Sequence, residues 1–226
     1  MPGPDDGRLD VRMAGEPLVA LAERALYWPA RRRLVIADLH LGKEHVFRRA
    51  GIAVPHGVTQ DDLQRLSQLL GSTGALSLWI VGDLLHGPSA PAGWKDAWRA
   101  WRQRHEAVDV AVLAGNHDRW LARAGLDVRL LGEVHSDGPF LFRHVPRQDP
   151  GGKHVIAGHV HPKARVSGLP RSWPVFWMKE GVTVLPAFSE FTGGHLVKTD
   201  AQSALLACVG GELVALPRGG THSDGR

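Results

Sequence analysis

Residue types that bind metal ions recur along this chain at a spacing of two. Asp38 and His40 are separated by one residue, and His159 and His161 repeat the same arrangement far downstream. Because alternate residues of an extended segment point to the same side, each pair can direct both side chains toward one ion. Asp83 lies between the pairs, and its carboxylate can bridge two cations that would otherwise repel each other. The pattern predicts a centre for two divalent metal ions.

Neutral ligands and a proton donor occupy the middle of the chain. Asn116 offers an amide oxygen to a metal, while the neighbouring His117 can stay unligated and give a proton to a leaving group.

Short apolar runs precede all of these polar residues. Runs of this length, rich in branched residues and closed by Gly or Asp, are typical of buried strands. The glycine before Asp83, Asn116 and His159 allows a tight backbone turn there. We expect strands at residues 34–37, 78–81, 110–114, 140–142 and 154–157.

Helical spacing appears between the runs. Thr59 can cap a helix that carries leucines at 63, 66, 69 and 70, and a second helix carries Trp94, Trp98 and Trp101 on one face. The tryptophans fit a face packed on a sheet better than a binding surface. Alternating strands and helices indicate an α/β sheet whose site lies beyond the carboxyl ends of the strands. The final third predicts short strands at 175–177, 182–185, 195–197, 204–209 and 212–216.

The composition limits the classes of protein that fit. The 226 residues are 43% hydrophobic, which suits one domain with a large core, expected at residues 9–216 with flexible termini at 1–8 and 217–226. Cys208 is the single cysteine, so no internal disulfide can form, and no run of about 18 apolar residues suggests a membrane span. We expect a cytoplasmic protein. The formal charge of +4 favours anionic partners but does not identify one.

The ordered motifs resemble those of the calcineurin-like metallophosphoesterase superfamily. They read Asp-Leu-His at 38–40, Gly-Asp-Leu-Leu-His at 82–86, Gly-Asn-His-Asp at 115–118, a middle histidine, and Gly-His-Val-His at 158–161. The resemblance implies a four-layer αββα sandwich, with two mixed sheets flanked by helices, and a two-metal hydrolysis of phosphate esters. It assigns Asp38, His40, Asp83 and His161 to one metal, Asp83, Asn116, the middle histidine and His159 to the other, and His117 as the acid. His144, which directly follows the apolar run Phe-Leu-Phe, is the preferred middle histidine, and His135, in a segment expected to be a loop, is the alternative. The metals are expected to be manganese, with iron, zinc or magnesium as alternatives.

One motif departs from the superfamily pattern. His86 stands where phosphatase members carry an aspartate that orients the catalytic histidine, so the group that orients His117 is open. Because phosphodiesterase members tolerate such changes, this position favours diester substrates.

Finer features resemble the bacterial ligase-associated DNA damage response endonuclease (PdeM) family. They include Asp-Leu-His-Leu-Gly-Lys-Glu at 38–44, Phe-Arg-Arg-Ala-Gly-Ile-Ala-Val-Pro at 47–55, and Leu-Pro-Ala-Phe at 185–188 before Phe-Thr-Gly-Gly at 191–194. This resemblance implies a metal-dependent nuclease or phosphodiesterase in DNA repair, associated with a DNA ligase and a helicase. Homodimers are expected from the superfamily alone.

Several cations follow the motifs closely enough to hold phosphates that flank a scissile bond. They are Lys43, Arg48, Arg49, Arg119 and Arg165. Trp173 and Trp177 could stack on bases, although Trp177 fits a core position better. The leading hypothesis is therefore hydrolysis of phosphodiesters in DNA. The alternatives are a small-molecule nucleotide phosphodiesterase or phosphatase, and a metal-binding scaffold without turnover.

Overall fold

The computed structural model describes residues 7–49, 51, 53, 55, 57–85, 93–190 and 192–218. His86 and Phe191 of the motifs lie outside these residues, as does the side chain of Arg49. Most of both expected flexible termini also lies outside them, and the domain boundaries at residues 9 and 216 stay a prediction.

The N-terminal half forms a seven-stranded mixed sheet. Strands β1 to β4 run antiparallel to their neighbours, and β4 to β7 are parallel. The parallel strands β4, β5 and β6 are buried on both faces, so their sequences are almost continuously apolar. The strands are β1 (Arg8–Met13), β2 (Glu16–Leu21), β3 (Ala25–Trp28), β4 (Arg33–Ala37), β5 (Ser77–Val81), β6 (Asp109–Leu113) and β7 (Arg129–Leu130).

The C-terminal half forms a nine-stranded mixed sheet with the order β14-β11-β12-β13-β10-β9-β8, from which β15 and β16 branch at β12. Its centre, β9-β10-β13, is parallel, while β12 pairs antiparallel with β11, β13 and β15. The strands are β8 (Val134–Asp137), β9 (Phe140–Arg143), β10 (His154–Ala157), β11 (Pro162–Arg165), β12 (Ser172–Lys179), β13 (Val182–Val184), β14 (His195–Leu196), β15 (Ser203–Val209) and β16 (Glu212–Leu216).

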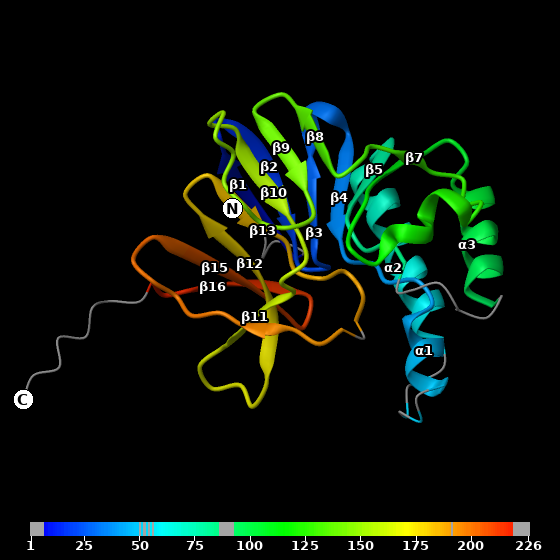
Figure 1. Cartoon of the computed structure of the whole chain (residues 1–226). Coiled ribbons are helices and arrows are strands. Elements are labelled where there is room, and N and C mark those ends of the chain that lie inside the picture. The colour runs from blue at the N-terminus through cyan, green and yellow to red at the C-terminus, as the bar shows by residue number, and fades with distance from the viewer. Residues whose placement is uncertain are drawn as a thin grey trace, which may run out of the picture.

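The helices gather on one side of the first sheet, away from the C-terminal strands (Figure 1). No helix follows Arg123 within the residues described, so helices flank the first sheet only. They are α1 (Lys43–Arg49), α2 (Val58–Thr73) and α3 (Gly93–Arg104), with short 3-10 helices η1 (Pro29–Arg31) and η2 (Asp118–Arg123). None is long and apolar enough to cross a membrane among these residues.

The first turn of α2 differs from the sequence prediction. Thr59 lies inside the helix, and Gly57, in a left-handed conformation, occupies the N-cap without a side-chain hydrogen bond. The carboxylate of Glu44 in α1 accepts the Val58 amide at 3.1 Å instead. A neighbouring helix therefore satisfies a backbone donor that a capping hydroxyl was expected to satisfy.

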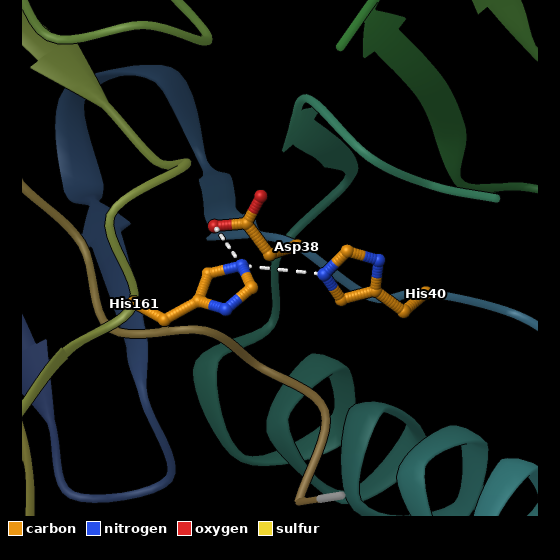
Figure 2. A group of neighbouring side chains, drawn as sticks. All are labelled: Asp38, His40 and His161. Atoms are coloured by element: carbon orange, nitrogen blue, oxygen red, sulfur yellow. Dashed lines mark hydrogen bonds and ion pairs between the residues drawn. The ribbon is translucent and has the colours of Figure 1, made fainter. Parts of the chain in front are cut away.

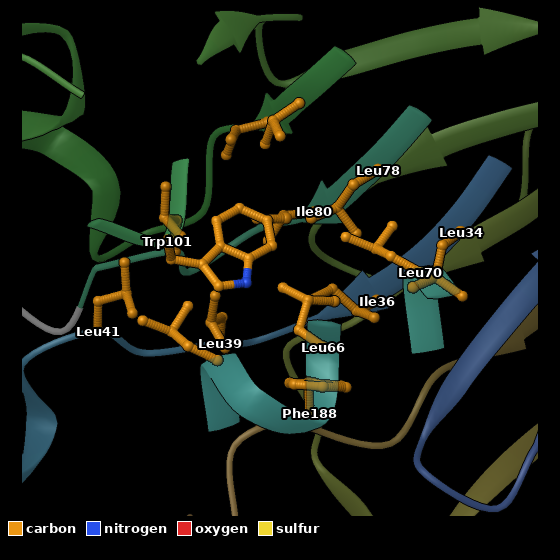
Figure 3. Packing of buried hydrophobic residues seen from close by; sticks show 14 of the residues in the cluster. Leu34, Ile36, Leu39, Leu41, Leu66, Leu70, Leu78, Ile80, Trp101 and Phe188 are labelled. Atoms are coloured by element: carbon orange, nitrogen blue, oxygen red, sulfur yellow. The ribbon is translucent and has the colours of Figure 1, made fainter. Parts of the chain in front are cut away.

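Strand alternation divides the core into two layers. Leu34 and Ile36 of β4 face the helices, where they pack with Leu66 of α2 and Trp101 of α3 (Figure 3). Val35 and Ala37 point the other way and pack between the two sheets, with Trp79, Phe142 and Ile156 among others. Burial of both faces of β4 fixes its register, because a slip of one residue would exchange the two layers.

The α/β class and the two mixed sheets are confirmed. The five apolar runs form β4, β5, β6, β9 and β10, and the predicted strands of the final third are β12 to β16. The tryptophans of α3 are buried in the core, as their spacing indicated. The sequence analysis did not predict the antiparallel strands β1 to β3.

Candidate active site

The polar motifs lie where parallel strands end. Asp38 follows β4, Asp83 follows β5 after one glycine, and Asn116 follows β6. His144 and His159 follow the parallel pair β9 and β10 of the other sheet. Because the carboxyl ends of neighbouring parallel strands meet at one edge, the two sheets bring their ligands to the same place.

Three side chains form a first candidate metal cluster. Asp38, His40 and His161 offer ligand atoms that all lie within 4.8 Å of one another. Figure 2 shows the three side chains pointing toward a common point, with His161 Nε2 at 3.5 Å from Asp38 Oδ2 and 3.2 Å from His40 Nε2. Asp38 and His40 come from the end of β4, and His161 comes from the turn before β11.

A second cluster lies beside the first. Asp83, His144 and His159 again offer ligand atoms within 4.8 Å of one another. His144 Nε2 lies 3.4 Å from Asp83 Oδ2, 3.0 Å from His159 Nδ1 and 2.9 Å from Asn116 Oδ1. The structure thus brings the amide oxygen of Asn116 to this cluster.

The two clusters share direct contacts. His144 Nδ1 lies 3.6 Å from Asp38 Oδ1, which belongs to the first cluster. The backbone amide of His159 donates a hydrogen bond of 2.9 Å to the other oxygen, Asp38 Oδ2. The seven residues that the motifs singled out as ligands therefore form one continuous site.

Backbone strain is concentrated at this site. Eight non-glycine residues among those described have a positive φ, and five of them are the site residues Asp38, His40, Asp83, His159 and His161. A left-handed conformation costs about 1–2 kcal/mol for most L-residues, so the surrounding fold must hold these five in place.

Glycines lie directly beneath the ligands. A Cβ at Gly82 would overlap the ring of His144, and one at Gly115 would overlap the Asp83 carboxylate. A Cβ at Gly158 would lie 2.7 Å from Asp38 Oδ2. Each of these three glycines therefore leaves room for a candidate ligand side chain that packs against it from elsewhere in the chain.

Burial, hydrogen bonds and neighbouring charges shift the pKa values of Asp83, His144 and His159. Burial alone would raise the pKa of Asp83, but hydrogen bonds from His144 and the His117 amide lower it to about 2. Burial opposes the charged form of His144, yet the Asp83 and Asp38 carboxylates outweigh it and raise its pKa. Burial and the neighbouring His144 lower the pKa of His159. Asp83 is thus a carboxylate, and His159 is a neutral imidazole suited to bind a metal.

The donor set fits divalent cations. Asp38 and Asp83 are buried carboxylates, and Asp38 Oδ1 and His144 Nδ1 are buried atoms without a hydrogen-bond partner among the residues that the structure describes. Carboxylate oxygens, an amide oxygen and imidazole nitrogens suit manganese, iron, zinc or magnesium. Two buried negative charges need cations nearby, and metal ions held by these residues would supply them.

One positioning residue lacked a role in the sequence interpretation. Asp118, the last residue of Gly-Asn-His-Asp, is buried and accepts the backbone amides of Leu84, Leu85 and Gly115 at 3.2, 2.9 and 2.9 Å. It ties the loop after Asp83 to the loop that carries Asn116. The sequence feature that could have indicated this role is the position of Asp118 directly after the candidate acid.

The two remaining candidate histidines lie in different settings. His117, with a side chain 43% exposed, is at the rim, where its Nε2 is 4.0 Å from Asp83 Oδ2 and its amide donates to Asp83 Oδ1 at 2.9 Å. His135 lies in β8 and packs against the Trp79 ring, with centroids 5.2 Å apart. The structure therefore brings His144, and not His135, into the cluster.

The expected substrate-binding cations are dispersed. Lys43 is buried at the start of α1, where burial lowers its pKa while Asp38 and Asp83 act in the opposite direction. Arg48 pairs with Glu44 at 3.2 Å, and Arg119 is exposed in η2 after His117. Arg165 lines a separate cavity with Leu196 and Leu205. Lys43 is the cation most closely associated with the two carboxylates.

Comparisons with known proteins agree with this geometry. The family described as calcineurin-like phosphoesterase matches residues 31–137. The crystal structure of the Pseudomonas putida nuclease MPE is 36% identical, with 92% of this chain and 100% of that chain covered and a TM-score of 0.81. The chain belongs to the calcineurin-like phosphoesterase family. It is a phosphoester hydrolase of a family that binds divalent metals.

More distant structures are also similar. Yfce, a phosphoesterase from E. coli, is 17% identical over 81% of this chain and 96% of its own, with a TM-score of 0.47. The protein AQ665 from Aquifex aeolicus is 18% identical over 57% of this chain and 78% of its own, with a TM-score of 0.40. No curated protein matches the chain.

Proposed function

We propose that this protein hydrolyses phosphodiester bonds in DNA with two divalent metal ions. The observation that carries the proposal is the pair of clusters, Asp38-His40-His161 and Asp83-His144-His159, joined by the contact of His144 with Asp38. Two adjacent ligand sets suit a reaction in which attacking and leaving oxygens both need stabilisation.

The ligands divide between the two ions as the clusters do. Asp38, His40 and His161 would hold one ion, Asn116, His144 and His159 would hold the other, and Asp83 would contribute its carboxylate to both. Two divalent ions bound there would activate water and stabilise negative charge on the phosphate. Manganese is the metal that we propose.

Two further side chains assist from outside the ligand sets. His117 lies at the exposed rim beside Asp83 and donates a proton to the departing oxygen. The ammonium of Lys43 interacts electrostatically with the Asp38 and Asp83 carboxylates, and we propose that it neutralises a phosphate oxygen. Arg48, Arg49 and Arg119 bind phosphates of the DNA strand that flank the scissile bond.

Similarity to a nuclease supports DNA as the proposed substrate. A nuclease with 36% identity covers nearly the whole chain. The motifs also resemble the ligase-associated DNA damage response endonucleases. We therefore propose a role in DNA repair in association with a DNA ligase and a helicase, and a homodimer as the working assembly.

A substrate panel tests the proposal. Protein purified without added metal is analysed for metal content and then assayed with manganese on single-stranded DNA, duplex DNA, cyclic nucleotides and bis-p-nitrophenyl phosphate. Cleavage of DNA is expected. Turnover of nucleotides without cleavage of DNA would identify a small-molecule phosphodiesterase instead.

The variant His117→Ala tests the proton donor. We expect kcat to fall by about 10²–10⁴-fold while the metal content stays unchanged, because His117 is not a ligand. An unchanged rate would remove His117 from the mechanism. Absence of any turnover in the wild type, despite bound metal, would identify a scaffold.

A further inference from the structure

A polar cavity lies outside the candidate metal centre and shares no lining residue with the two clusters. It has a volume of about 300 Å³, and its lining includes Arg24, Lys163, Arg171 and Trp173. This volume is at the lower end of the range for small-molecule sites. The residues come from the β2–β3 turn, from β11, and from the segment that leads into β12, so only the folded chain assembles them.

The cavity has an excess of positive charge that nearby acids do not neutralise. Glu190 accepts hydrogen bonds from Arg24 Nη2 at 3.3 Å and Arg65 Nη1 at 2.8 Å, and Glu23 pairs with Arg65 at 3.7 Å. Both carboxylates of the lining are therefore engaged by arginines.

The two other cations of the cavity have no acidic partner. Neither Lys163 nor Arg171 forms an ion pair with a residue in the described part of the chain. Burial lowers the pKa of Lys163, and repulsion from Arg24 and Arg171 adds to that effect. An anion bound among these three cations would relieve their repulsion.

Lys163 is held in place by close packing. Its Nζ donates to the Thr192 carbonyl at 3.1 Å. A Cβ at Gly194 would lie 2.8 Å from two carbons of the Lys163 side chain, so this glycine makes room for it. The Thr-Gly-Gly part of the motif at 191–194, which had no assigned chemistry, thus supports a cation of the cavity.

Arg171 and Trp173 add a flat surface. The guanidinium carbon of Arg171 lies 3.9 Å from the centroid of the Trp173 ring. Arginine planes and aromatic rings both stack on nucleobases with little regard to base identity. The cavity therefore combines sites for a phosphate and for a base.

The cavity is next to the metal centre along the chain. Lys163 follows the candidate ligand His161 by two residues, so their Cα atoms are at most about 7 Å apart. A lysine of the cavity lining therefore lies close to the candidate metal centre along the backbone.

We propose that this cavity binds the nucleotide adjacent to the scissile phosphate of a single-stranded DNA substrate. Lys163 and Arg24 hold its phosphate, and Arg171 on Trp173 stacks on its base. This inference rests on the proposed function, because it assigns a subsite to the same substrate.

The test compares two exposed cations that each stack on a tryptophan. Arg171→Ala removes the cation over Trp173 in the cavity. Lys179→Ala is the matched control, since Lys179 Nζ lies 3.7 Å from the Trp177 centroid at the other end of β12, outside the cavity lining. Each variant is assayed with manganese on a labelled single-stranded oligonucleotide and on bis-p-nitrophenyl phosphate, which has neither a second phosphate nor a nucleobase for the cavity to bind.

Arg171→Ala should raise KM for the oligonucleotide about tenfold, through lost stacking, and leave kcat unchanged. The slope of log KM against log salt concentration should stay at the wild-type value, because Arg171 is assigned to the base and not to a phosphate. Turnover of bis-p-nitrophenyl phosphate should stay at the wild-type rate, which also shows that the variant is folded. Lys163→Met, which keeps the packing on Gly194 and removes the charge that holds the phosphate, should reduce the slope of log KM against log salt concentration by about 0.7, the value for one phosphate contact on a single strand.

Equal KM values for Arg171→Ala, Lys179→Ala and the wild type would overturn the subsite and leave the nuclease proposal intact. Failure of the wild type to cleave the oligonucleotide, with normal turnover of bis-p-nitrophenyl phosphate, would overturn both. The two failures are therefore distinguishable in one experiment.

Discussion

The two sheets contribute different chemistry to the candidate metal centre. The first sheet supplies both carboxylates, Asp38 and Asp83, together with His40 and Asn116. The second sheet supplies the imidazoles of His144, His159 and His161 from its own strand ends and turns. Each cluster contains residues from both sheets.

The difference shows that neither half of the chain holds a complete ligand set. The first half provides the negative charge that attracts cations, and the second provides imidazole nitrogens that could complete their coordination. Packing between the sheets, where Trp79 meets Phe142 with ring centroids 4.9 Å apart, therefore sets the distance between charge and nitrogen donors.

Asp83→Asn should produce the largest effect and tests whether the first sheet dominates metal binding. Loss of the bridging charge is expected to reduce turnover by about three orders of magnitude, because the metals supply several kcal/mol of transition-state stabilisation. His159→Gln, from the second sheet, should retain more metal after dialysis. Metal analysis and bis-p-nitrophenyl phosphate turnover measure both, and equal losses would contradict this division of roles.

Asp118→Asn should reduce metal affinity or turnover by about 10–100-fold, the usual effect of removing support for a ligand. The amide group of asparagine cannot accept all three backbone amides that Asp118 holds within the first half. Metal titration followed by activity measures the effect. Asp127→Asn, at an exposed carboxylate away from the site, is the control and should match the wild type.

Gly158→Ala tests the junction between the sheets. The new Cβ would lie 2.7–2.9 Å from Asp38 Oδ2, the Ala37 Cβ and the Val81 carbonyl, all in the first half. Overpacking of this kind should lower the free energy of unfolding by about 1–3 kcal/mol. Gly193→Ala is the control, since no atom lies within 4 Å of its Cβ. Urea unfolding compares them, and equal stabilities would show that the sheets separate easily.

The smallest expected effect is the lack of alkylation at Cys208 in the folded protein. It is packed between the sheets, and burial raises its pKa to about 12. At pH 8 roughly one thiol in ten thousand would be ionised, so iodoacetamide should not modify the folded protein within hours. Mass spectrometry before and after denaturation measures this. Rapid alkylation without denaturant would indicate that the packing between the sheets opens.

Local patterns predicted most of the site. Asp-x-His and Gly-His-x-His after apolar runs were sufficient to choose the ligands, because strand ends and spacing are local properties. The strands β1 to β3 were not predicted, since β1 is largely exposed and lacks a continuous apolar run. The bracing role of Asp118 and the cavity around Arg24 and Lys163 depend on contacts between residues far apart in sequence, which no local spacing encodes.

The left-handed conformations of the ligand residues have an evolutionary consequence. Asp38, His40, Asp83, His159 and His161 each occupy backbone geometry that glycine would adopt with less strain. Selection for stability alone would replace them, whereas selection for hydrolysis retains them. Random mutagenesis screened only for thermal resistance should therefore recover glycine or asparagine at these positions, and every such clone should be inactive.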